Sequence, residues 1–413
     1  MGHEPAIDRF ESVFGVGVPP AIPGASIIAI VLSYNEAMRL PHFLEHYSAM
    51  GVGHFIVVDN GSTDETAELL DTDTRVTRIY TTKPYSKNKA AWREVLADMF
   101  CTDKWTLFID VDELLIYPGW PALDLRGYCD LLDVRGEDAL FTTMVDMYPD
   151  VPLSQLRYEQ GTSFVEVAPY FDTGNYRLIP IPPKARKQWP TPQYRLFGGA
   201  RERLFSDAND RSAGVLAGIL SKVFFAIDRR NLRPAKLRRS LDAKVLNLMG
   251  EGKQKLSPAN MSKVPLLRWR EGTRFPGGPH RVSETYAMSD DWGALLHFKY
   301  FDDFGPRSKE AVDRGQHAAG AEHYKIYVGG LGKIEDQSLM FSGSRRFSST
   351  EDLTSAGLMR ISPATQRALE KGSACLHRFL AGRVPCGSVT YARGVIRRYI
   401  CSSGFQQFQI RAL

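Results

Sequence analysis

Residues 105–118 read WTLFIDVDELLIYP, and this stretch decides which fold the sequence predicts. Its mostly apolar start predicts a buried strand that ends at two aspartates separated by one valine. Because residues i and i+2 of a strand point to the same side, Asp110 and Asp112 are expected to face one spot. Two carboxylates on one spot suit a divalent metal ion that also holds phosphate oxygens. The alternative is a strand end with solvated acids.

Polar loops follow two earlier strands as well. Residues 26–32 and 54–58 are apolar runs typical of buried parallel strands, and helical patterns lie between the runs. This alternation of strand and helix predicts a doubly wound α/β sheet. The loops 33–36 (Ser-Tyr-Asn-Glu) and 59–64 (Asp-Asn-Gly-Ser-Thr-Asp) then fall at the carboxyl edge of the sheet, where such folds bind ligands. Three polar strand ends at one edge favour a binding site over ordinary turns.

Composition sets the class of protein and of partner. The chain has 413 residues, 43% hydrophobic and 24% charged, with a net charge of +5. This weak basic surplus suits an anionic ligand or a membrane surface, and it is too small to predict a nucleic-acid partner. The five cysteines are widely spaced, which favours a reducing compartment and argues against structural zinc. The chain shows neither a signal-peptide pattern nor an apolar run long enough for a spanning helix, so a cytoplasmic location is predicted.

We expect five segments along the chain. Three prolines break regular structure in the first of them. The expected segments are a leader (1–25), a nucleotide-sugar-binding core (26–205), an inserted apolar and basic helical segment (206–256), the remainder of the catalytic domain with the acceptor side (257–340) and a helical C-terminal tail (341–413). Within the tail, helices are predicted near 363–382 and 389–400.

Two stretches leave alternatives open. Residues 213–239 join an apolar stretch, too short to span a bilayer, to a cluster of arginines and lysines. They predict either an interfacial helix that holds anionic headgroups on the inner membrane face or a buried helix with a solvated basic tail. Residues 150–200 mix prolines with aromatic residues such as Trp189. They suit a rim that stacks on sugar rings, and equally a packed irregular loop.

The motifs 33–36, 57–64 and 108–113, in this order, resemble those of family 2-type glycosyltransferases of the GT-A fold. More narrowly, the chain is similar to the bacterial branch related to the family 92 (DUF23-type) transferases. Weaker matches are Met147–Pro149, Gly198–Phe205, Lys263–Trp269 and His297-Phe-Lys299. The resemblance covers residues 26–300, and the segment 206–256 has no counterpart in it.

The resemblance implies a GT-A, Rossmann-like α/β fold, with a mostly parallel sheet and helices on both faces. The implied function is a metal-dependent, inverting glycosyltransferase of the hexosyltransferase type, acting in polysaccharide biosynthesis. It would move a sugar from a nucleotide-diphosphate donor, a UDP-sugar first, to a glycan or lipid-linked acceptor at the inner membrane face. Mn²⁺ or Mg²⁺ would neutralise the charge that grows on the leaving phosphate.

Two other functions stay open. One is a non-catalytic module that binds a nucleotide or carbohydrate on the same scaffold. The other is a nucleotidyltransferase, which also uses paired acids on a Rossmann-like sheet. That class normally has a glycine-rich phosphate loop after the first strand, where this chain has Ser33–Glu36.

The resemblance also implies roles for individual residues. Asp59 would bind the nucleobase or ribose, with Ser33, Asn35 and Glu36 lining the same pocket. Asp110 would bind both ribose and metal, Asp112 would be the more direct metal ligand, and His297 would complete the metal site. The candidate contacts to the diphosphate are basic residues, namely Lys87, Lys89, Arg93, Arg201 and Lys299.

An inverting transferase also needs a carboxylate that deprotonates the acceptor hydroxyl. In the wider group this base lies well after the D-x-D pair, near the acceptor helix, where this chain has Glu202. Asp146, at the end of the strand that follows the D-x-D motif, is the alternative. The acidic pair usual in the family is absent, so both residues stay candidates.

Overall fold

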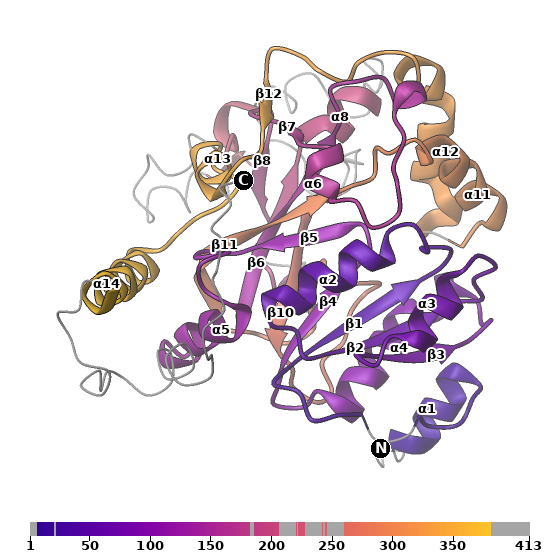
Figure 1. The fold of residues 1–413 in the computed structure, drawn as a ribbon, viewed down its shortest axis with the longest axis horizontal. Coiled ribbons are helices and arrows are strands. Elements are labelled where there is room, and N and C mark those ends of the chain that lie inside the picture. Colours follow the sequence, from indigo (N-terminus) through magenta and orange to yellow (C-terminus); the bar gives the residue numbers. More distant parts are fainter. Residues whose placement is uncertain are drawn as a thin grey trace.

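The computed structural model describes residues 6–380, except 20–21, 182–185, 206–219, 221, 228–241, 243, 246–259 and 317. A large mixed sheet runs through this part of the chain, in the strand order β12-β7-β6-β10-β4-β1-β2-β3 (Figure 1). Strand β11 extends the sheet beside β6, and β5 pairs with β11. The carboxyl ends of β1, β2 and β4 therefore lie together at one edge.

The first half of the sheet is parallel. Its strands are apolar and mostly buried, as expected for strands that helices cover on both faces. The parallel strands are β1 (Ile27–Ser33), β2 (His54–Asp59), β3 (Val76–Tyr80) and β4 (Trp105–Ile109). The helices between them are α2 (Leu40–Met50), α3 (Thr66–Thr72) and α4 (Tyr85–Phe100).

Antiparallel pairs enter the sheet beyond β4. Strand β10 runs antiparallel between β4 and β6, whereas β11 runs parallel to β6. These strands are β5 (Glu113–Ile116), β6 (Ala139–Tyr148), β7 (Tyr170–Asp172), β10 (Ser262–Arg268), β11 (Met288–His297) and β12 (Ser344–Arg346). A separate hairpin joins β8 (Arg177–Pro180) and β9 (Tyr194–Phe197).

Further helices surround the sheet. In Figure 1, α11 and α12 lie beside each other above the end of the sheet that carries β3, and α14 projects on the opposite side. The remaining described helices are α1 (Ala6–Phe14), α5 (Leu125–Val134), α6 (Phe164–Val167), α8 (Gly199–Phe205), α11 (Phe304–Arg314), α12 (Ala318–Ile334), α13 (Thr350–Ser355) and α14 (Pro363–Leu380), together with the short η1 (Leu153–Gln155).

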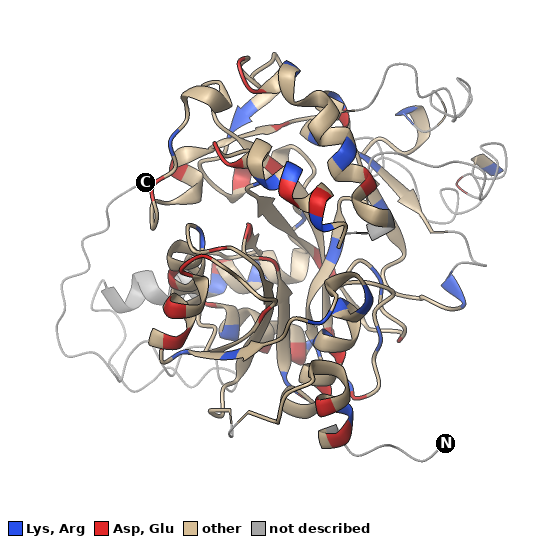
Figure 2. Ribbon diagram, turned by 90° about the vertical axis from the view of Figure 1, so that its right-hand side faces the viewer, with Lys and Arg blue, Asp and Glu red and all other residues tan. Residues whose placement is uncertain are grey.

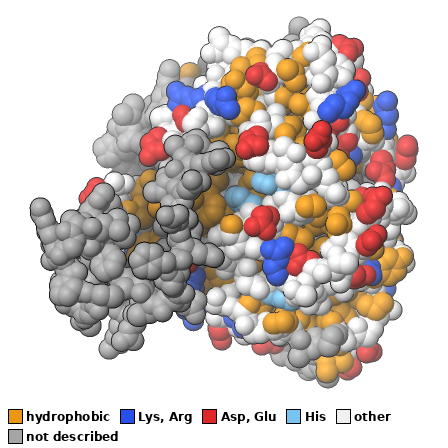
Figure 3. Space-filling model, viewed as in Figure 1, with side chains coloured by type: hydrophobic (Ala, Val, Ile, Leu, Met, Phe, Trp, Pro, Cys, Tyr) orange, Lys and Arg blue, Asp and Glu red, His pale blue; other side chains and the backbone are white. Residues whose placement is uncertain are grey.

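The predicted Rossmann-like α/β fold class is confirmed. Helix α14 corresponds to the helix predicted over 363–382, while the one predicted over 389–400 lies outside the described residues. Most of the inserted segment 206–256, including most of the stretch 213–239, is also outside them. No helix in the described part of the chain has the length and apolar character needed to cross a membrane. Figure 3 shows charged side chains of both signs spread among hydrophobic ones on one face.

The N-terminal segment differs from the expected irregular leader. Residues 6–14 form α1, which packs against α4. Phe10 and Phe14 are fully or almost fully buried, and the Phe14 ring stacks on Trp92 at a centroid distance of 6.1 Å. Because residues four apart lie on one helix face, these two phenylalanines give α1 an apolar side that the core covers. The segment is therefore part of the same packed unit.

Two hydrophobic cores lie on opposite faces of the sheet. Strand β1 sends Ile27, Ala29 and Val31 into one core and Ile28 and Ile30 into the other, as the alternation of side chains along a strand requires. The first core also fixes the segment after the D-x-D motif.

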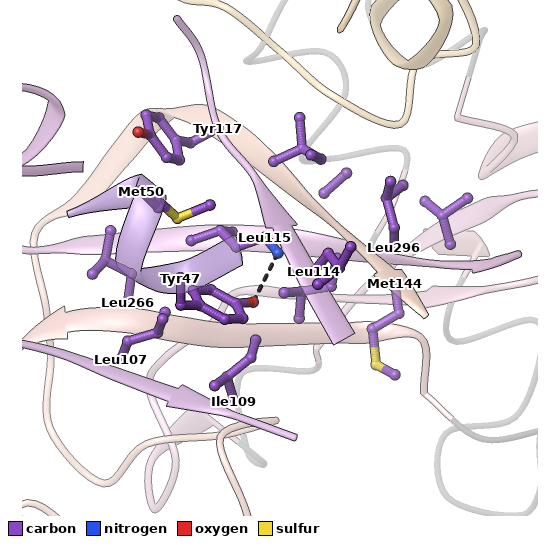
Figure 4. Packing of buried hydrophobic residues seen from close by; sticks show 14 of the residues in the cluster. Tyr47, Met50, Leu107, Ile109, Leu114, Leu115, Tyr117, Met144, Leu266 and Leu296 are labelled. Atoms are coloured by element: carbon purple, nitrogen blue, oxygen red, sulfur yellow. Dashed lines mark hydrogen bonds between the residues drawn. The ribbon is translucent and has the colours of Figure 1, made fainter. Parts of the chain in front are cut away.

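Figure 4 shows Tyr47 of α2 within the first core, its hydroxyl bonded to the backbone of β5. The hydroxyl donates to the Glu113 carbonyl at 3.0 Å and accepts from the Leu115 amide at 2.9 Å. Both groups are buried, so these bonds satisfy polar groups that water cannot reach. The contact holds the start of β5, and with it Glu113, at the edge of the sheet.

Candidate active site

A cleft of about 1040 Å³ opens at the carboxyl edge of the parallel strands. Its lining combines acids, cations and aromatic side chains from segments far apart in the sequence. Of the predicted site residues, the cleft is lined by Ser33, Asn35, Glu36, Lys87, Lys89, Arg93, Asp110, Asp112, Arg201, His297 and Lys299. The structure thus brings together most of the predicted set, whereas Asp59, Asp146 and Glu202 are not among the lining residues.

Three side chains in the cleft form a group that could hold a metal ion. The ligand atoms of Asp112, Glu113 and His297 all lie within 4.8 Å of one another, and Nε2 of His297 lies 3.3 Å from Oδ2 of Asp112. Neighbouring ligands of an octahedral ion with bonds of about 2.1 Å are themselves about 3 Å apart. The two carboxylates are the oxygen ligands that Mn²⁺ and Mg²⁺ prefer, and the 3.3 Å between Asp112 and His297 is close to this spacing.

Strand pairing produces this arrangement. Strand β11 lies between β5 and β6, and its last residue, His297, is in register with Glu113 on one side and Asp146 on the other. The Nδ1 of His297 lies 2.6 Å from Oδ1 of Asp146, whose side chain is fully buried. A proton on Nδ1 bonded to this carboxylate leaves Nε2 free to face Asp112, as in carboxylate–histidine–metal sites.

Charges around His297 stabilise its protonated form when no cation is bound. Burial would lower the pKa of His297, but Asp112 and Asp146 raise it above its usual value. Burial would likewise raise the pKa of Asp112, yet His297 and Lys299 hold it well below its usual range. Asp112 is therefore an ionised carboxylate, available to a cation at neutral pH.

Arg201 also binds Asp146, next to His297. Its guanidinium donates to both carboxylate oxygens of Asp146, at 2.6 and 3.2 Å. Two glycines allow helix α8 to begin close to β8. A Cβ on Gly198 would lie 2.0 Å from the Asn175 carbonyl oxygen, and one on Gly199 would lie 2.7 Å from the Tyr176 hydroxyl. Side chains at these positions would push α8, and hence Arg201, away from the floor of the cleft.

Asp110 lies in the cleft but is held by cations. Lys263 Nζ lies 2.6 Å from Oδ2 of Asp110 and also bonds Glu113, and Arg93 Nη2 lies 3.0 Å from Oδ1 of Asp110. Burial would raise the pKa of Asp110, but Lys263 and Arg93 lower it to about 2. In this arrangement the third acid near His297 is Glu113, whereas the predicted ligand Asp110 faces Lys263 and Arg93.

One side of the cleft consists of the loop after β1 and the face of α11 that contacts it. We call this the α11 wall, formed by Tyr34–Arg39 and Asp303–Arg314. Asn35, with a left-handed φ of 52°, donates to Glu310 at 3.2 Å, and Arg307 bonds both oxygens of Glu36. Arg39 donates to Asp303 through two bonds of 2.6 and 2.7 Å. In Figure 2, acidic and basic residues are interspersed on the helices of this side.

Asp59 lies beneath this loop, fully buried. Its carboxylate accepts from the Ser62 amide at 3.0 Å and from Arg78 at 3.1 Å. The Asn60 amide donates to the Ser33 carbonyl at 2.9 Å, so the two strand-end loops are joined. In the structure Asp59 shapes the predicted nucleotide pocket from behind, and its predicted contact with a nucleobase or ribose stays a prediction.

Both predicted bases are held by arginines. Arg177 donates to the two oxygens of Glu202 at 2.8 and 2.6 Å, and Asp146 is enclosed by Arg201 and His297. Burial would raise the pKa of Asp146, but Arg201 and His297 keep it far below its usual range. As described, either carboxylate would have to leave its ion pair before it could accept a proton from an acceptor.

Basic residues approach the same space from α4 and from the end of β11. Lys89 lies over the Tyr85 ring at 5.3 Å, and burial, followed by the nearby Arg93, lowers its pKa. Lys299 donates to the Tyr324 hydroxyl at 3.2 Å and lies over the same ring. A pocket lined by such cations favours a ligand with several negative charges.

Sequence reasoning missed three contributors to the site. Glu113 directly follows the D-x-D pair, and it became a ligand candidate only through the pairing of β5 with β11. Lys263 begins the weaker motif Lys263–Trp269, but its contact with Asp110 depends on the position of β10 beside β4. Arg307 carried no local signal at all. Each of these contacts joins residues far apart along the chain, which periodicity cannot reveal.

Neither a family model nor a curated protein matches the chain. Among solved structures, it is similar to glucosyl-3-phosphoglycerate synthase from Mycobacterium tuberculosis, in complex with Mn²⁺, UDP and phosphoglyceric acid, at 18% identity and a TM-score of 0.20. The match covers 30% of this chain and 44%, less than half, of that one.

Two nucleotide-using enzymes are also among the matches. One is 4-diphosphocytidyl-2C-methyl-D-erythritol synthase, at 13% identity, 34% and 66% coverage and a TM-score of 0.21. The other is the inositol-1-phosphate CTP transferase from T. maritima, at 15% identity, 55% and 98% coverage and a TM-score of 0.21. Coverage is given for this chain first. The function proposed below is therefore inferred from the residues of the cleft.

Proposed function

We propose that this chain is a metal-dependent, inverting glycosyltransferase that uses a nucleotide-diphosphate sugar, with a UDP-sugar as the first candidate donor. The acceptor would be a glycan or a lipid-linked sugar at the inner membrane face. The observation that carries the proposal is the group Asp112, Glu113 and His297 at the carboxyl edge of a parallel sheet, inside a cleft rich in cations. This edge is where α/β sheets bind nucleotides.

The three side chains would hold Mn²⁺ or Mg²⁺. When bound, such an ion acts as a Lewis acid toward the diphosphate oxygens of the leaving nucleotide. Asp146 keeps the imidazole of His297 in the orientation that a ligand needs, because it accepts the bond from Nδ1. Lys263 bonds both Asp110 and Glu113 and balances the charge of the two carboxylates, which would otherwise repel each other.

The protein's own groups would bind and orient the donor. Asn35 and Glu36 border the part of the cleft next to the ends of β1 and β2, which suits the nucleoside. Arg93 and Lys299 lie on two sides of the acidic group and would stabilise negative charge on the diphosphate. Glu202 and Asp146 stay the candidates for the base that takes the acceptor proton.

The test measures the unfolding midpoint of the full chain with a panel of nucleotide sugars, with and without Mn²⁺. A donor well above its dissociation constant should stabilise the chain by about 2–4 kcal/mol, and only when the metal is present. Asp112→Asn should abolish this metal-dependent gain and lower sugar transfer by at least about 100-fold. Asp290→Asn, an exposed site outside the cleft lining, is the matched control for the loss of one charge.

The products distinguish this function from the two alternatives. A glycosyltransferase releases a nucleoside diphosphate, whereas a nucleotidyltransferase releases pyrophosphate from a nucleoside triphosphate. Metal-dependent binding of a nucleotide sugar without turnover against a broad acceptor panel would indicate a binding module. Stabilisation by donors that persists in Asp112→Asn would contradict the assigned metal site.

A further inference from the structure

Two arginines in the cleft have no acidic partner among the residues that the structure describes. Arg195 and Arg281 line the cleft together with Trp189, and we call these three residues the arginine wall. Within the described part of the chain, no carboxylate forms an ion pair with either arginine. The Nε–H of Arg195 is buried and has no hydrogen-bond partner among those residues. Both arginines line the same cleft, and burial, followed by the charge of Arg281, lowers the pKa of Arg195.

Backbone contacts hold the arginine wall in place. The Val282 amide donates to the Thr191 carbonyl at 2.8 Å and so joins the segment of Arg281 to the loop that carries Trp189. The Leu196 amide donates to Asn260 at 3.2 Å, which fixes the strand of Arg195 beside the start of β10. Lys263, the second residue of β10, bonds Asp110. These contacts place the arginine wall beside the part of the cleft that carries Asp110.

Two neighbouring guanidinium groups without a counter-charge are unfavourable until an anion binds. Arginine is the side chain best suited to bind a carboxylate or phosphate through two parallel hydrogen bonds. An indole beside such a pair offers a flat apolar surface for the body of the same ligand. This side of the cleft is thus suited to bind a small organic anion that carries a ring or a chain.

We propose that the arginine wall binds the anionic group, a phosphate or a carboxylate, of a negatively charged acceptor. The inference rests on the proposed glycosyltransferase function, and it narrows the acceptor from glycans in general to phosphorylated or acidic sugars and their lipid-linked forms. Donor and acceptor would occupy different parts of the cleft. The donor diphosphate lies at Asp112, Arg93 and Lys299, and the acceptor anion lies at Arg195 and Arg281.

The experiment titrates the full chain calorimetrically with inorganic phosphate, first alone and then with saturating UDP and Mg²⁺. Wild-type protein should bind phosphate in both conditions. Arg195→Gln and Arg281→Gln should each weaken phosphate binding by about tenfold, as expected when one charge-assisted bond pair is lost. UDP binding should be unchanged in both variants. Lys187→Gln, an exposed cation near Trp189 and outside the cleft lining, is the control and should bind phosphate like wild type.

Three results would overturn the proposal. They are a wild-type protein that binds no phosphate, equal binding by wild type and both arginine variants, or displacement of phosphate by UDP and Mg²⁺. The last result would assign the arginines to the donor diphosphate. Failure of the glycosyltransferase function appears differently, as loss of UDP binding while arginine-dependent phosphate binding persists. Acetate in place of phosphate shows whether a carboxylate or a phosphate is preferred.

Discussion

The two sides of the cleft differ in whether their arginines are paired with acids. In the α11 wall, Arg39 lies against Asp303 and Arg307 against Glu36, with two hydrogen bonds in each pair. In the arginine wall, Arg195 and Arg281 have no acidic partner among the described residues. The first arrangement holds two distant segments together, whereas the second leaves cations ready for a ligand. Charges that face the same cleft therefore stabilise the fold on one side and, as we propose, bind the acceptor on the other.

The largest effect expected from this contrast is on stability. Arg307→Gln should lower the free energy of unfolding by about 2 kcal/mol, because Glu36 loses both charge-assisted hydrogen bonds. Arg281→Gln should change it by less than about 0.5 kcal/mol, because no described acid depends on that arginine. Urea unfolding of the two variants and of wild type, followed by circular dichroism, measures both values.

A double substitution separates the ion pair from other effects of Arg307. In Glu36→Gln with Arg307→Gln, neither charge is left buried alone, so the loss should be smaller than the sum of the two single losses. Arg367→Gln, on an exposed position of α14, controls for the loss of an arginine elsewhere. Equal losses in Arg307→Gln and Arg281→Gln would remove the distinction between the two sides.

The ion pair between Arg177 and Glu202 should stabilise the fold, as the ion pairs of the α11 wall do. The side chains of Arg177 and Glu202 are only 8% and 14% exposed, so Glu202→Gln should cost about 1–2 kcal/mol of unfolding free energy. The same variant tests the candidate role of Glu202 as the base: if the carboxylate stays bonded to Arg177, the pH profile of sugar transfer should be that of wild type. A loss of turnover of about 100-fold or more with unchanged stability would instead identify Glu202 as the base that the sequence predicts.

The sequence predicted β1, β2 and β4 well because these strands are buried on both faces. Apolar runs such as 26–32 and 54–58 are nearly unbroken there, so their positions can be read locally. Helix α1 was missed because only Phe10 and Phe14 mark its buried side. Prolines close behind them suggested an irregular segment.

The site was predicted as far as local signals reach. Asp112 and His297 come together as expected, since Asp112 lies in the turn between β4 and β5 and His297 ends β11, the partner of β5. The closeness of Glu113 to His297 could not be foreseen, because it depends on the register that sets the two residues opposite each other, and the metal role of Asp110 stays a prediction. The pairing of Asp110 with Lys263 likewise depends on a strand contributed from much later in the chain.

The smallest expected effect is the pH dependence of stability that Asp303 of the α11 wall contributes. Burial would raise the pKa of Asp303, but Arg39 holds it below its usual value. Because the folded pKa is below the unfolded one, the carboxylate contributes its stability above the unfolded pKa of about 4 and loses it as the pH falls through the folded pKa. Wild type should thus lose stability below about pH 4 more steeply than Asp303→Asn, measured by urea unfolding at each pH. Arg195→Gln should follow the wild-type curve, because an arginine does not titrate in this range, and a divergence there would show that an acid pairs with the arginine wall after all.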